Sequence, residues 1–478
     1  MASQQLQLGV IGLGTMGANL ARNAARNKTT VALFNRTTEK TDEFMVAHGS
    51  EGKFIPCHSL KDFAKALKKP RPILLMVKAG DAVDIVIQEL LPLLEEGDIL
   101  IDGGNSHFRD TQRREKELAE RGIALIGLGV SGGEEGALHG PSMMPGGGAS
   151  AYKKIEPLLK KMAADDGMEG KCVTHLGPGC AGHFVKMVHN GIEYGLMQLI
   201  AECYDLMKNV GHSSNDDLVK IFSEWNAGEL QSFLVEITAQ IFQKKDPETG
   251  DFLIDLIGDV AEQKGTGKWA TEAAMDLGVA IPTITAAVDA RILSADPLQR
   301  KQLSVENPES LPEPYPEQKS IAELCRSALL LSWLAVYGQG FQMLMAASKE
   351  YQWNLSLAEI TRIWGGGCII RSSLLAKFRD MFATPQSQRE GLKTQILDLA
   401  RGERQVDWRR LIAIATGSGI PVPALSASLA YADTIRRKRL PQNLIQAQRD
   451  CFGAHGYGRT DREGSFHTNW NHQDADGG

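Results

Sequence analysis

The stretch Leu6-Gln7-Leu8-Gly9-Val10-Ile11-Gly12-Leu13-Gly14-Thr15-Met16-Gly17 decides the fold of the first part of the chain. Its first six residues have the pattern of a short buried strand, and a helical pattern follows from Ala18 to about Asn27. The glycines of the intervening GxGxxG motif permit a tight turn and let a ligand approach the backbone closely. The following helix points its N–H groups toward a pyrophosphate. The stretch therefore predicts a dinucleotide-binding α/β domain; the alternative is a glycine-rich turn without a ligand.

The end of the second predicted strand, residues 30–34, indicates which dinucleotide binds. Sites specific for NAD usually place Asp or Glu there, where the carboxylate binds the ribose 2′-OH. Here Asn35, Arg36 and Thr37 follow the strand, and the nearest acid is Glu39. A guanidinium and a hydroxyl suit a 2′-phosphate, so the sequence favours NADP over NAD. The alternative is a surface arginine in a loop.

Three further predicted strands end in residues suited to ligand binding. Residues 73–77 are followed by Lys78, and residues 98–102 are followed by Gly103-Gly104-Asn105-Ser106. Because ligands of open α/β sheets bind at the carboxyl ends of the strands, Lys78 and Asn105 are predicted to lie near the nicotinamide. Residues 124–127 lead to a Ser-Gly-Gly turn at 131–133, which exposes N–H groups suited to a carboxylate or is a plain loop. Residues 141–148, with three consecutive glycines, predict another tight loop.

A long helix is predicted to begin at residue 182 and to run to about residue 210. Residues three, four and seven apart share one face of a helix. One face here carries Lys186, His189, Asn190, Glu193 and Tyr194, and almost every residue between them is apolar or small. The face is either a solvated stripe or a row of proton-transfer groups on a rigid backbone. These residues alone leave both interpretations open.

The helical region contains a short internal repeat. Residues 218–225 resemble residues 357–364, with Leu, Ile and Trp at the same offsets. Each copy follows a long apolar helix, and the second of these contains an uncharged run at residues 327–348. That run is long enough to span a bilayer, but polar residues such as Gln339 interrupt it. We therefore expect a helix buried within a duplicated helical domain.

Two further segments carry candidate ligand-binding residues. Between the repeated units, Lys264, Thr266 and Arg291 are candidates for holding a phosphate; a helix-start lysine and a surface arginine are the alternatives. From about residue 441 the chain is rich in glycine, histidine and aromatic residues and lacks helical periodicity. We expect this tail to pack as an irregular segment on another surface, for instance that of a second subunit.

Composition excludes several classes of protein. A formal charge of −6 over 478 residues argues against nucleic acid as the main partner. The seven cysteines include no CxxC motif, which favours reduced thiols over disulfides or a zinc site. The amino terminus shows no basic segment followed by a cleavage pattern, so a cytoplasmic protein is expected.

Together these stretches resemble the 6-phosphogluconate dehydrogenase family, the decarboxylating, NADP-linked enzymes of the pentose phosphate pathway. The resemblance is nearly full-length and is also carried by residues 101–106, 130–137, 263–269, 366–372 and 449–455. It implies an α/β Rossmann-like NADP-binding domain at residues 1–178. An all-α substrate and dimerisation domain with an internal duplication would occupy residues 179–440. A C-terminal tail, residues 441–478, would contact the partner subunit of a homodimer.

The resemblance also implies roles for the candidate residues in the oxidative decarboxylation of 6-phospho-D-gluconate to D-ribulose 5-phosphate and CO2. Lys186 would be the general base and Glu193 the general acid. NADP would be held by Gly12, Leu13, Gly14, Thr15, Met16, Gly17, Asn35, Arg36, Thr37, Val77, Lys78, Ala79 and Asn105. The sugar acid would be held by Asn105, Ser131, Gly132, Gly133, His189, Asn190 and His455. Its phosphate would be held by Tyr194, Lys264, Arg291 and Arg449, with Arg449 and His455 supplied by the tail of the other subunit.

This chemistry makes a demand on Lys186 that a structure can test. An unperturbed lysine has a pKa of about 10.4 and serves as a base only where burial or nearby cations lower that value. Once protonated, it can polarise the C3 carbonyl, so no metal site is expected. Conversely, Glu193 needs a raised pKa to deliver a proton to C1.

Two alternatives remain. One is a 3-hydroxyisobutyrate-type β-hydroxyacid dehydrogenase, which would share the glycine loop and the lysine. Those enzymes are shorter and lack the duplicated helical unit and the tail. The other is a non-catalytic NADP-binding sensor, which the presence of both Lys186 and Glu193 disfavours.

Overall fold

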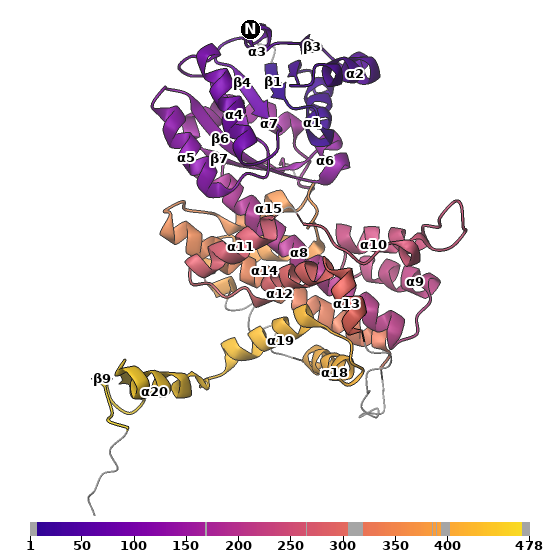
Figure 1. Cartoon of the computed structure of the whole chain (residues 1–478), viewed down its shortest axis with the longest axis vertical. Coiled ribbons are helices and arrows are strands. Elements are labelled where there is room, and N and C mark those ends of the chain that lie inside the picture. Colours follow the sequence, from indigo (N-terminus) through magenta and orange to yellow (C-terminus); the bar gives the residue numbers. More distant parts are fainter. Residues whose placement is uncertain are drawn as a thin grey trace, which may run out of the picture. The chain divides into compact units, whose positions relative to one another are not determined.

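A computed structural model describes residues 7–167, 170–263, 265–304, 319–384, 386–388, 390–392 and 402–470. The chain forms two compact units, Met1–Leu429 and Ala430–Gly478. The first unit begins as an α/β structure and continues as a helical structure (Figure 1). The predicted domain division of this unit at about residue 178 stays a prediction.

The α/β part is a seven-stranded sheet with the strand order β3-β2-β1-β4-β5-β6-β7. Strands β1 to β6 are parallel, and β7 runs antiparallel to β6. The strands are β1 Gln7–Ile11, β2 Thr30–Phe34, β3 Phe54–Cys57, β4 Pro72–Leu75, β5 Ile99–Asp102, β6 Ala124–Ser131 and β7 Ser142–Gly147. The order reverses between β1 and β4, which is where doubly wound sheets bind dinucleotides. The predicted Rossmann-like fold is confirmed.

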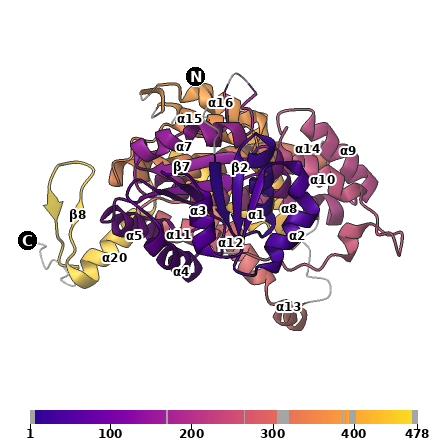
Figure 2. The same cartoon turned by 90° about the horizontal axis from the view of Figure 1, so that it is seen from above.

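Helices cover both faces of this sheet (Figure 2). They are α1 Thr15–Arg26, α2 Glu39–His48, α3 Leu60–Ala66, α4 Asp81–Leu90, α5 Phe108–Ala119, α6 Gly133–His139 and α7 Ala149–Met162, with 3₁₀ turns η1 Gly49–Glu51 and η2 Leu91–Leu93. Alternate side chains of a strand enter opposite cores. Leu8 and Val10 pack with α1, α2, α6 and α7, whereas Ile11 packs with α3, α4 and α5. Because both faces are buried, the strands are nearly continuous apolar runs.

The prediction of a tight loop at residues 141–148 is wrong, because most of this segment is strand β7. Gly146 and Gly147 belong to the strand because its surroundings leave no room for side chains. A side chain on Gly146 would collide with the backbone of α8, and one on Gly147 would lie 2.6 Å from the Leu125 carbonyl oxygen. The first two of the three consecutive glycines therefore mark close packing in a strand, whereas a side chain on Gly148 would meet nothing within 4 Å.

The helical part is built on two long antiparallel helices, α8 and α14. Its helices are α8 Ala181–Asn209, α9 Asn215–Asn226, α10 Phe233–Gln243, η3 Leu253–Leu256, α11 Thr266–Asp276, α12 Pro282–Ser294, α13 Pro297–Leu303, α14 Ile321–Glu350, α15 Leu357–Trp364, α16 Ser373–Met381, α18 Glu403–Gly417 and α19 Pro423–Arg436. The predicted helix from residue 182 is thus α8. Gly195 of α8 lies against Val336 of α14, and Gly340 of α14 lies against Ile192.

The helix order confirms the predicted internal duplication. The series α8, α9 and α10 is repeated as α14, α15 and α16, and the two matching tryptophans, Trp225 and Trp364, are both buried in the second helix of each series. Ser232 and Ser372 begin the third helices, and they pair with each other in an antiparallel bridge. The two copies therefore face one another.

The uncharged run is buried, as predicted. Within the described part of the chain, α14 is the one helix long and apolar enough to cross a membrane, but 72% of its most apolar window is covered by other parts of the protein. It packs between α8 and α18. Burial inside the helical part accounts for its composition.

The second compact unit comprises the end of α19 and the tail, and the structure of the tail differs from the prediction. Residues 442–453, expected to be irregular, form helix α20 Gln442–Gly453, and a short hairpin of β8 Tyr457–Gly458 and β9 Ser465–Phe466 follows. The apolar residues Leu444, Ile445 and Phe452 are exposed on α20. They form no buried stripe, so the sequence lacks the periodicity by which helices are recognised.

Candidate active site

Helix α8 approaches the carboxyl end of the sheet unusually closely. A side chain at Gly182 would collide with the carbonyl oxygens of Gly127 in β6 and Met144 in β7. A side chain at Gly129 would collide with the Cβ of Lys186. These two glycines therefore allow the first turns of α8 to lie against β6 and β7, and they bring Lys186 to the edge where ligands of such sheets bind.

Lys186 is buried there, with a relative exposure of 6%. Its Nζ lies 3.4 Å from Nδ1 of His189, one turn further along α8. Burial lowers the pKa of Lys186 from its ordinary value, and the negative charge of Glu193 only partly opposes this shift. The structure therefore gives Lys186 the direction of pKa change that a general base requires.

His189 links this helix to the sheet and to the second copy of the repeat. Its Nε2 lies 3.1 Å from the Ser131 hydroxyl, which in turn accepts a hydrogen bond of 3.4 Å from the backbone N–H of Ile369. The edge of the ring also contacts Trp364. Burial, followed by the charge of Lys186, lowers the pKa of His189 well below its usual value. His189 is therefore neutral at physiological pH.

Glu193 completes the row. Its carboxylate lies 3.7 Å from His189 Nδ1, and its side chain is partly exposed at 22%. Burial raises the pKa of Glu193, against the opposing influence of Lys186 and Arg291. Lys186, His189 and Glu193 thus form a continuous row of groups whose pKa values are shifted by their surroundings. Asn190 is buried beside this row, with its Oδ1 3.3 Å from His189 Nδ1.

A second cluster lies one residue further along α8. The Arg291 guanidinium of α12 stacks 3.5 Å from the centre of the Tyr194 ring. Gly267 of α11 packs against the same ring, where a side chain would lie 2.7 Å from Tyr194 carbons. Two of the predicted phosphate-binding residues therefore meet, and Thr266 is buried at the start of α11. Lys264 lies outside the described residues.

The predicted NADP residues line two cavities that share Met76, Val77 and Lys78. The first, of about 320 Å³, is lined by Gly12, Gly14, Asn35, Arg36 and Thr37. The second, of about 680 Å³, is lined by Met16, Ala79 and Asn105. Leu13, Thr15 and Gly17 belong to the loop but line neither cavity. Gly132 and Gly133 lie at the start of α6, where both have positive φ angles.

Sequence reasoning missed several residues of these cavities, among them Lys40, His107 and Trp269. Lys40 lines the first cavity together with Arg36, from the first turn of the following helix α2, and adds a second cation. His107 and Trp269 line the second cavity, and their rings meet edge to face. A search for basic residues within one turn of Thr37 would have found Lys40. Trp269 comes from the distant helix α11, so no local signal marks it.

The glycine loop is shaped to receive a ligand. Gly12 has a φ of +96°, which disfavours other residues, and a side chain there would lie 2.5 Å from the Met76 carbonyl oxygen. At Gly14, by contrast, a side chain would meet nothing within 4 Å and would point into the open space of the first cavity. Asn35 uses its Oδ1 to accept a hydrogen bond of 3.0 Å from the Leu13 N–H. The side chain of Asn35 therefore orders the loop.

The remaining predicted residues belong to the second compact unit. Arg449 lies on α20, and His455 lies in the loop that follows it; both are exposed within this unit. Their predicted role in the active site of a partner subunit stays a prediction. Among the residues that the structure describes, no group of three or more His, Cys, Asp and Glu side chains is suited to a metal ion.

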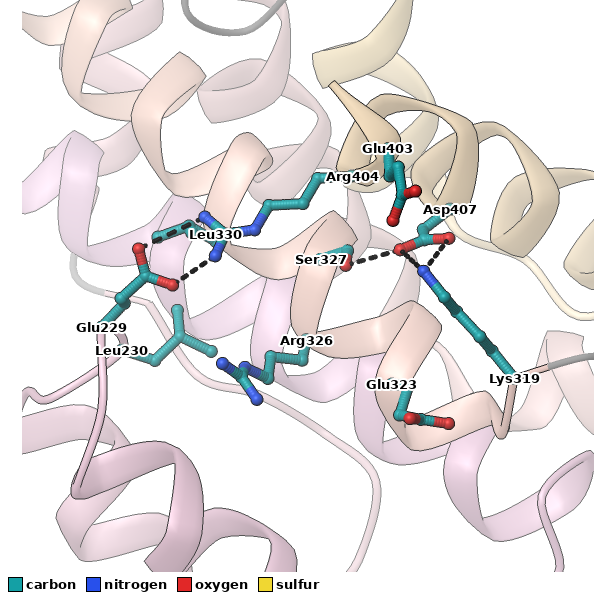
Figure 3. Close-up of a pocket in the computed structure, with 10 residues that line it drawn as sticks. All are labelled: Glu229, Leu230, Lys319, Glu323, Arg326, Ser327, Leu330, Glu403, Arg404 and Asp407. Atoms are coloured by element: carbon teal, nitrogen blue, oxygen red, sulfur yellow. Dashed lines mark hydrogen bonds and ion pairs between the residues drawn. The ribbon is translucent and has the colours of Figure 1, made fainter. Parts of the chain in front are cut away.

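A polar cavity of about 230 Å³ lies elsewhere, between α14, α18 and the segment that precedes α10 (Figure 3). Its strongest charges pair with one another. Arg404 binds Glu229, and Asp407 accepts hydrogen bonds from Lys319 and Ser327. None of the predicted site residues lines it, so we regard it as a structural ion-pair cluster.

Two family models together match nearly the whole described chain. The NAD binding domain of 6-phosphogluconate dehydrogenase matches residues 7–177, and the 6-phosphogluconate dehydrogenase C-terminal domain matches residues 182–470. The two matched regions meet just before α8, which carries the row that begins at Lys186.

Individual proteins show the same similarity. The chain is 51% identical over 469 residues to the decarboxylating 6-phosphogluconate dehydrogenase of Synechococcus elongatus, covering 97% of this chain and 99% of that protein. It is 50% identical over 470 residues to the NADP(+)-dependent, decarboxylating enzyme of Bacillus subtilis, with the same coverage. A solved structure of Plasmodium falciparum 6-phosphogluconate dehydrogenase is also similar, with a TM-score of 0.90, 40% identity and coverage of 97% of this chain and 100% of that one. The chain therefore belongs to the family of decarboxylating 6-phosphogluconate dehydrogenases.

Proposed function

We propose that the chain oxidises and decarboxylates 6-phospho-D-gluconate to D-ribulose 5-phosphate and CO2, with reduction of NADP+ to NADPH. The observation that carries this proposal is the row formed by the buried Lys186 and His189 and the partly buried Glu193, next to a dinucleotide-type cavity. That cavity is lined by Val130, and the next residue, Ser131, contacts His189. The row and the cavity are therefore adjacent.

Lys186 acts first, as the base. Its lowered pKa favours the neutral amine, which takes the proton of the C3 hydroxyl as the C3 hydride leaves. The resulting ammonium donates a hydrogen bond to the C3 carbonyl of the β-keto acid. When CO2 departs, the electron pair of the broken C–C bond becomes the enolate, and Lys186 returns its proton to the enolate oxygen.

Glu193 then completes the reaction. Its raised pKa keeps a proton available, which it delivers to C1 of the enediol while Lys186 takes the enediol O–H proton. Transfer of that proton from Lys186 back to Glu193 restores the starting state. His189 lies between the two groups, 3.4 Å from Lys186 and 3.7 Å from Glu193, and supplies a path for it.

The substrate phosphate is assigned to Tyr194, Arg291 and Lys264, together with Arg449 from the tail of a second subunit. Arg291 is already held over Tyr194 and needs little ordering to bind an anion. The sugar acid is assigned to Asn105, Ser131, Gly132, Gly133, His189, Asn190 and the tail residue His455. The homodimer and a cytoplasmic location are parts of the same proposal.

The residues around the two cavities fit NADP. The open space beside Gly14 suits a pyrophosphate, and Arg36 and Lys40 supply two cations for a 2′-phosphate. Val77, Lys78, Ala79 and Asn105 border the second cavity, where the nicotinamide end would lie. When bound, the nicotinamide ring accepts the hydride from C3.

The direct test mixes the purified chain with 6-phosphogluconate and NADP+ and follows both NADPH and CO2. Equal amounts of the two products support the proposal. NADPH formation with 3-hydroxyisobutyrate, and none with 6-phosphogluconate, would instead identify a β-hydroxyacid dehydrogenase. Binding of NADP+ without turnover of either compound would identify a sensor. A parallel assay with NAD+ measures the cofactor preference.

A further inference from the structure

The tail unit is organised around one carboxylate, that of Asp450. This side chain is fully buried, at 0% relative exposure. Its Oδ1 accepts a hydrogen bond of 2.9 Å from the Gly456 N–H and lies 2.9 Å from Nδ1 of His467. Its Oδ2 accepts hydrogen bonds of 3.0 Å from the Thr468 N–H and 2.8 Å from the Trp470 indole N–H. One side chain thus joins the end of α20 to the loop and hairpin that follow.

Among described residues 441–470, no apolar side chain is fully buried beside this carboxylate. Asp450 is the only buried residue within the described helix α20, whereas Leu444, Ile445 and Phe452 are exposed. A segment without an apolar core keeps a defined shape only through specific polar contacts. The conformation of residues 449–470 therefore depends on Asp450 more than on any burial of apolar surface.

The same contacts hold the two tail residues assigned to the substrate. The Arg449 guanidinium donates a hydrogen bond of 3.1 Å to Gln446 Oε1, and Gln446 Nε2 donates one of 2.6 Å to the Gly456 carbonyl oxygen. The Gly456 N–H donates a hydrogen bond to Asp450, and the Gly456 carbonyl oxygen accepts the one from Gln446. The peptide groups on both sides of Gly456 are therefore held in place. His455 immediately precedes Gly456, and its imidazole lies over Gly453, where a side chain would come within 2.8 Å of it.

We propose that Asp450 is a positioning residue, which holds Arg449 and His455 at the spacing required to bind the phosphate and the sugar acid of the substrate. This proposal rests on the proposed function. Asp450 acts through its neighbours and contacts neither substrate nor cofactor. Three of its four partners, the Gly456 N–H, the Thr468 N–H and the Trp470 indole N–H, can only donate, so an amide cannot fully substitute: in either orientation the NH2 group of Asn faces at least one N–H donor.

The test compares Asp450→Asn with Asp461→Asn, an identical change in the same unit. Asp461 is exposed and pairs only locally with Arg459, at 2.8 and 2.7 Å. For Asp450→Asn we expect the KM for 6-phosphogluconate to rise about tenfold or more, since bonds to charged groups are among the stronger ones. The Kd for NADP+ should stay unchanged, because the glycine loop belongs to the first compact unit, and the Gly456 and Thr468 amides should exchange hydrogen faster. Asp461→Asn should match the wild type.

A double substitution separates positioning from a general structural effect. In an Arg449→Ala, His455→Ala background, Asp450→Asn should raise the KM by less than about twofold, because the residues that it positions are gone. A tenfold rise in both backgrounds, or equal behaviour of Asp450→Asn and Asp461→Asn, would overturn the proposal. If Asp450→Asn fails to fold, Trp470→Phe serves as a milder variant, because it removes only one of the hydrogen-bond donors to Asp450. In that variant, an unchanged KM for 6-phosphogluconate together with unchanged hydrogen exchange at the Thr468 amide would overturn the proposal. A wild-type chain that does not turn over 6-phosphogluconate would instead disprove the function on which the proposal rests.

Discussion

Helices α8 and α14 occupy equivalent places in a duplicated architecture, yet they bury different kinds of residue. In α14 the fully buried positions are apolar or neutral, and the amide of Gln339 is satisfied by two hydrogen bonds with Thr283. In α8 the buried positions include Lys186 and His189, whose contacts are with one another and with neighbouring polar groups. Burying ionisable groups costs stability unless they are paired and hydrogen-bonded. The difference supports the proposal that the polar row of α8 serves chemistry, whereas the buried residues of α14 serve packing.

Replacing Lys186 should have the largest effect. For Lys186→Met we expect kcat to fall by at least about 10³–10⁴-fold, the upper range for one proton-transfer group, while the Kd for NADP+ stays within about twofold because the glycine loop is untouched. Steady-state kinetics and calorimetric NADP+ binding measure the two effects. A near-normal kcat would contradict the assignment of the base.

The same variant should be more stable than the wild type. Because burial lowers the pKa of Lys186 in the folded state, the unfolded chain binds more protons between that lowered value and 10.5. The free energy of unfolding of the wild type therefore rises with pH across this window. At pH values below the window, the buried Lys186 amine is protonated, and the cost of burying its charge lowers that free energy in full. Lys186→Met should raise the melting temperature at neutral pH, and the gain should shrink as the pH approaches 10.5. A lower melting temperature at neutral pH would show that Lys186 is structural.

Replacing Glu193 should affect a later step. For Glu193→Gln we expect kcat to fall by about 10²–10⁴-fold, since protonation of C1 is lost. Hydride transfer depends on Lys186, so the first turnover should still produce a rapid burst of about one NADPH per active site. Stopped-flow absorbance distinguishes the burst from the slow steady state. Absence of the burst would place Glu193 before or at hydride transfer.

The contact between α8 and α12 should control binding more than chemistry. For Arg291→Ala we expect the KM for 6-phosphogluconate to rise about 10–100-fold, because a charge-assisted bond to the phosphate is lost. The kcat at saturating substrate should change little. Arg291→Lys keeps the positive charge but loses the planar stacking on Tyr194, so its KM should lie between that of the wild type and that of Arg291→Ala. A loss confined to kcat would argue against phosphate binding.

Changes in α14 should have the smallest effect on activity. For Gln339→Leu we expect a loss of about 1–3 kcal/mol of unfolding free energy, because the buried Thr283 N–H is left without its acceptor. Ser332→Ala is the matched control: this buried hydroxyl has no hydrogen-bond partner among the residues that the structure describes, so its removal should not lower the unfolding free energy. Urea unfolding measures both. A kcat loss in either variant as large as that of Lys186→Met would remove the distinction between the two helices.

Much of the candidate site was predictable from local pattern. The strand and glycine loop that end at Gly17, the residues after β2, and the row on α8 all follow from periodicities of two or 3.6 residues. The errors arose where local pattern and packing disagree. Gly146 and Gly147 suggest a turn in isolation, yet they form part of β7 because the backbones of α8 and β6 pass too close for side chains. Helix α20 was missed because it lacks a buried apolar face.

The sequence by itself determined the dinucleotide loop and the polar face of α8, because each depends on residues close together in the chain. It also determined the duplication, because two distant segments, residues 218–225 and 357–364, share the same local pattern. Only the tertiary structure decided which residues of other elements contact the polar face of α8. Ser131 from β6 and Trp364 from α15 enclose His189, and Arg291 from α12 covers Tyr194. Burial among these distant elements shifts the pKa values of Lys186 and Glu193. A pKa depends on three-dimensional surroundings, so the pKa shifts that the proposed roles of Lys186 and Glu193 require arise only in the folded chain.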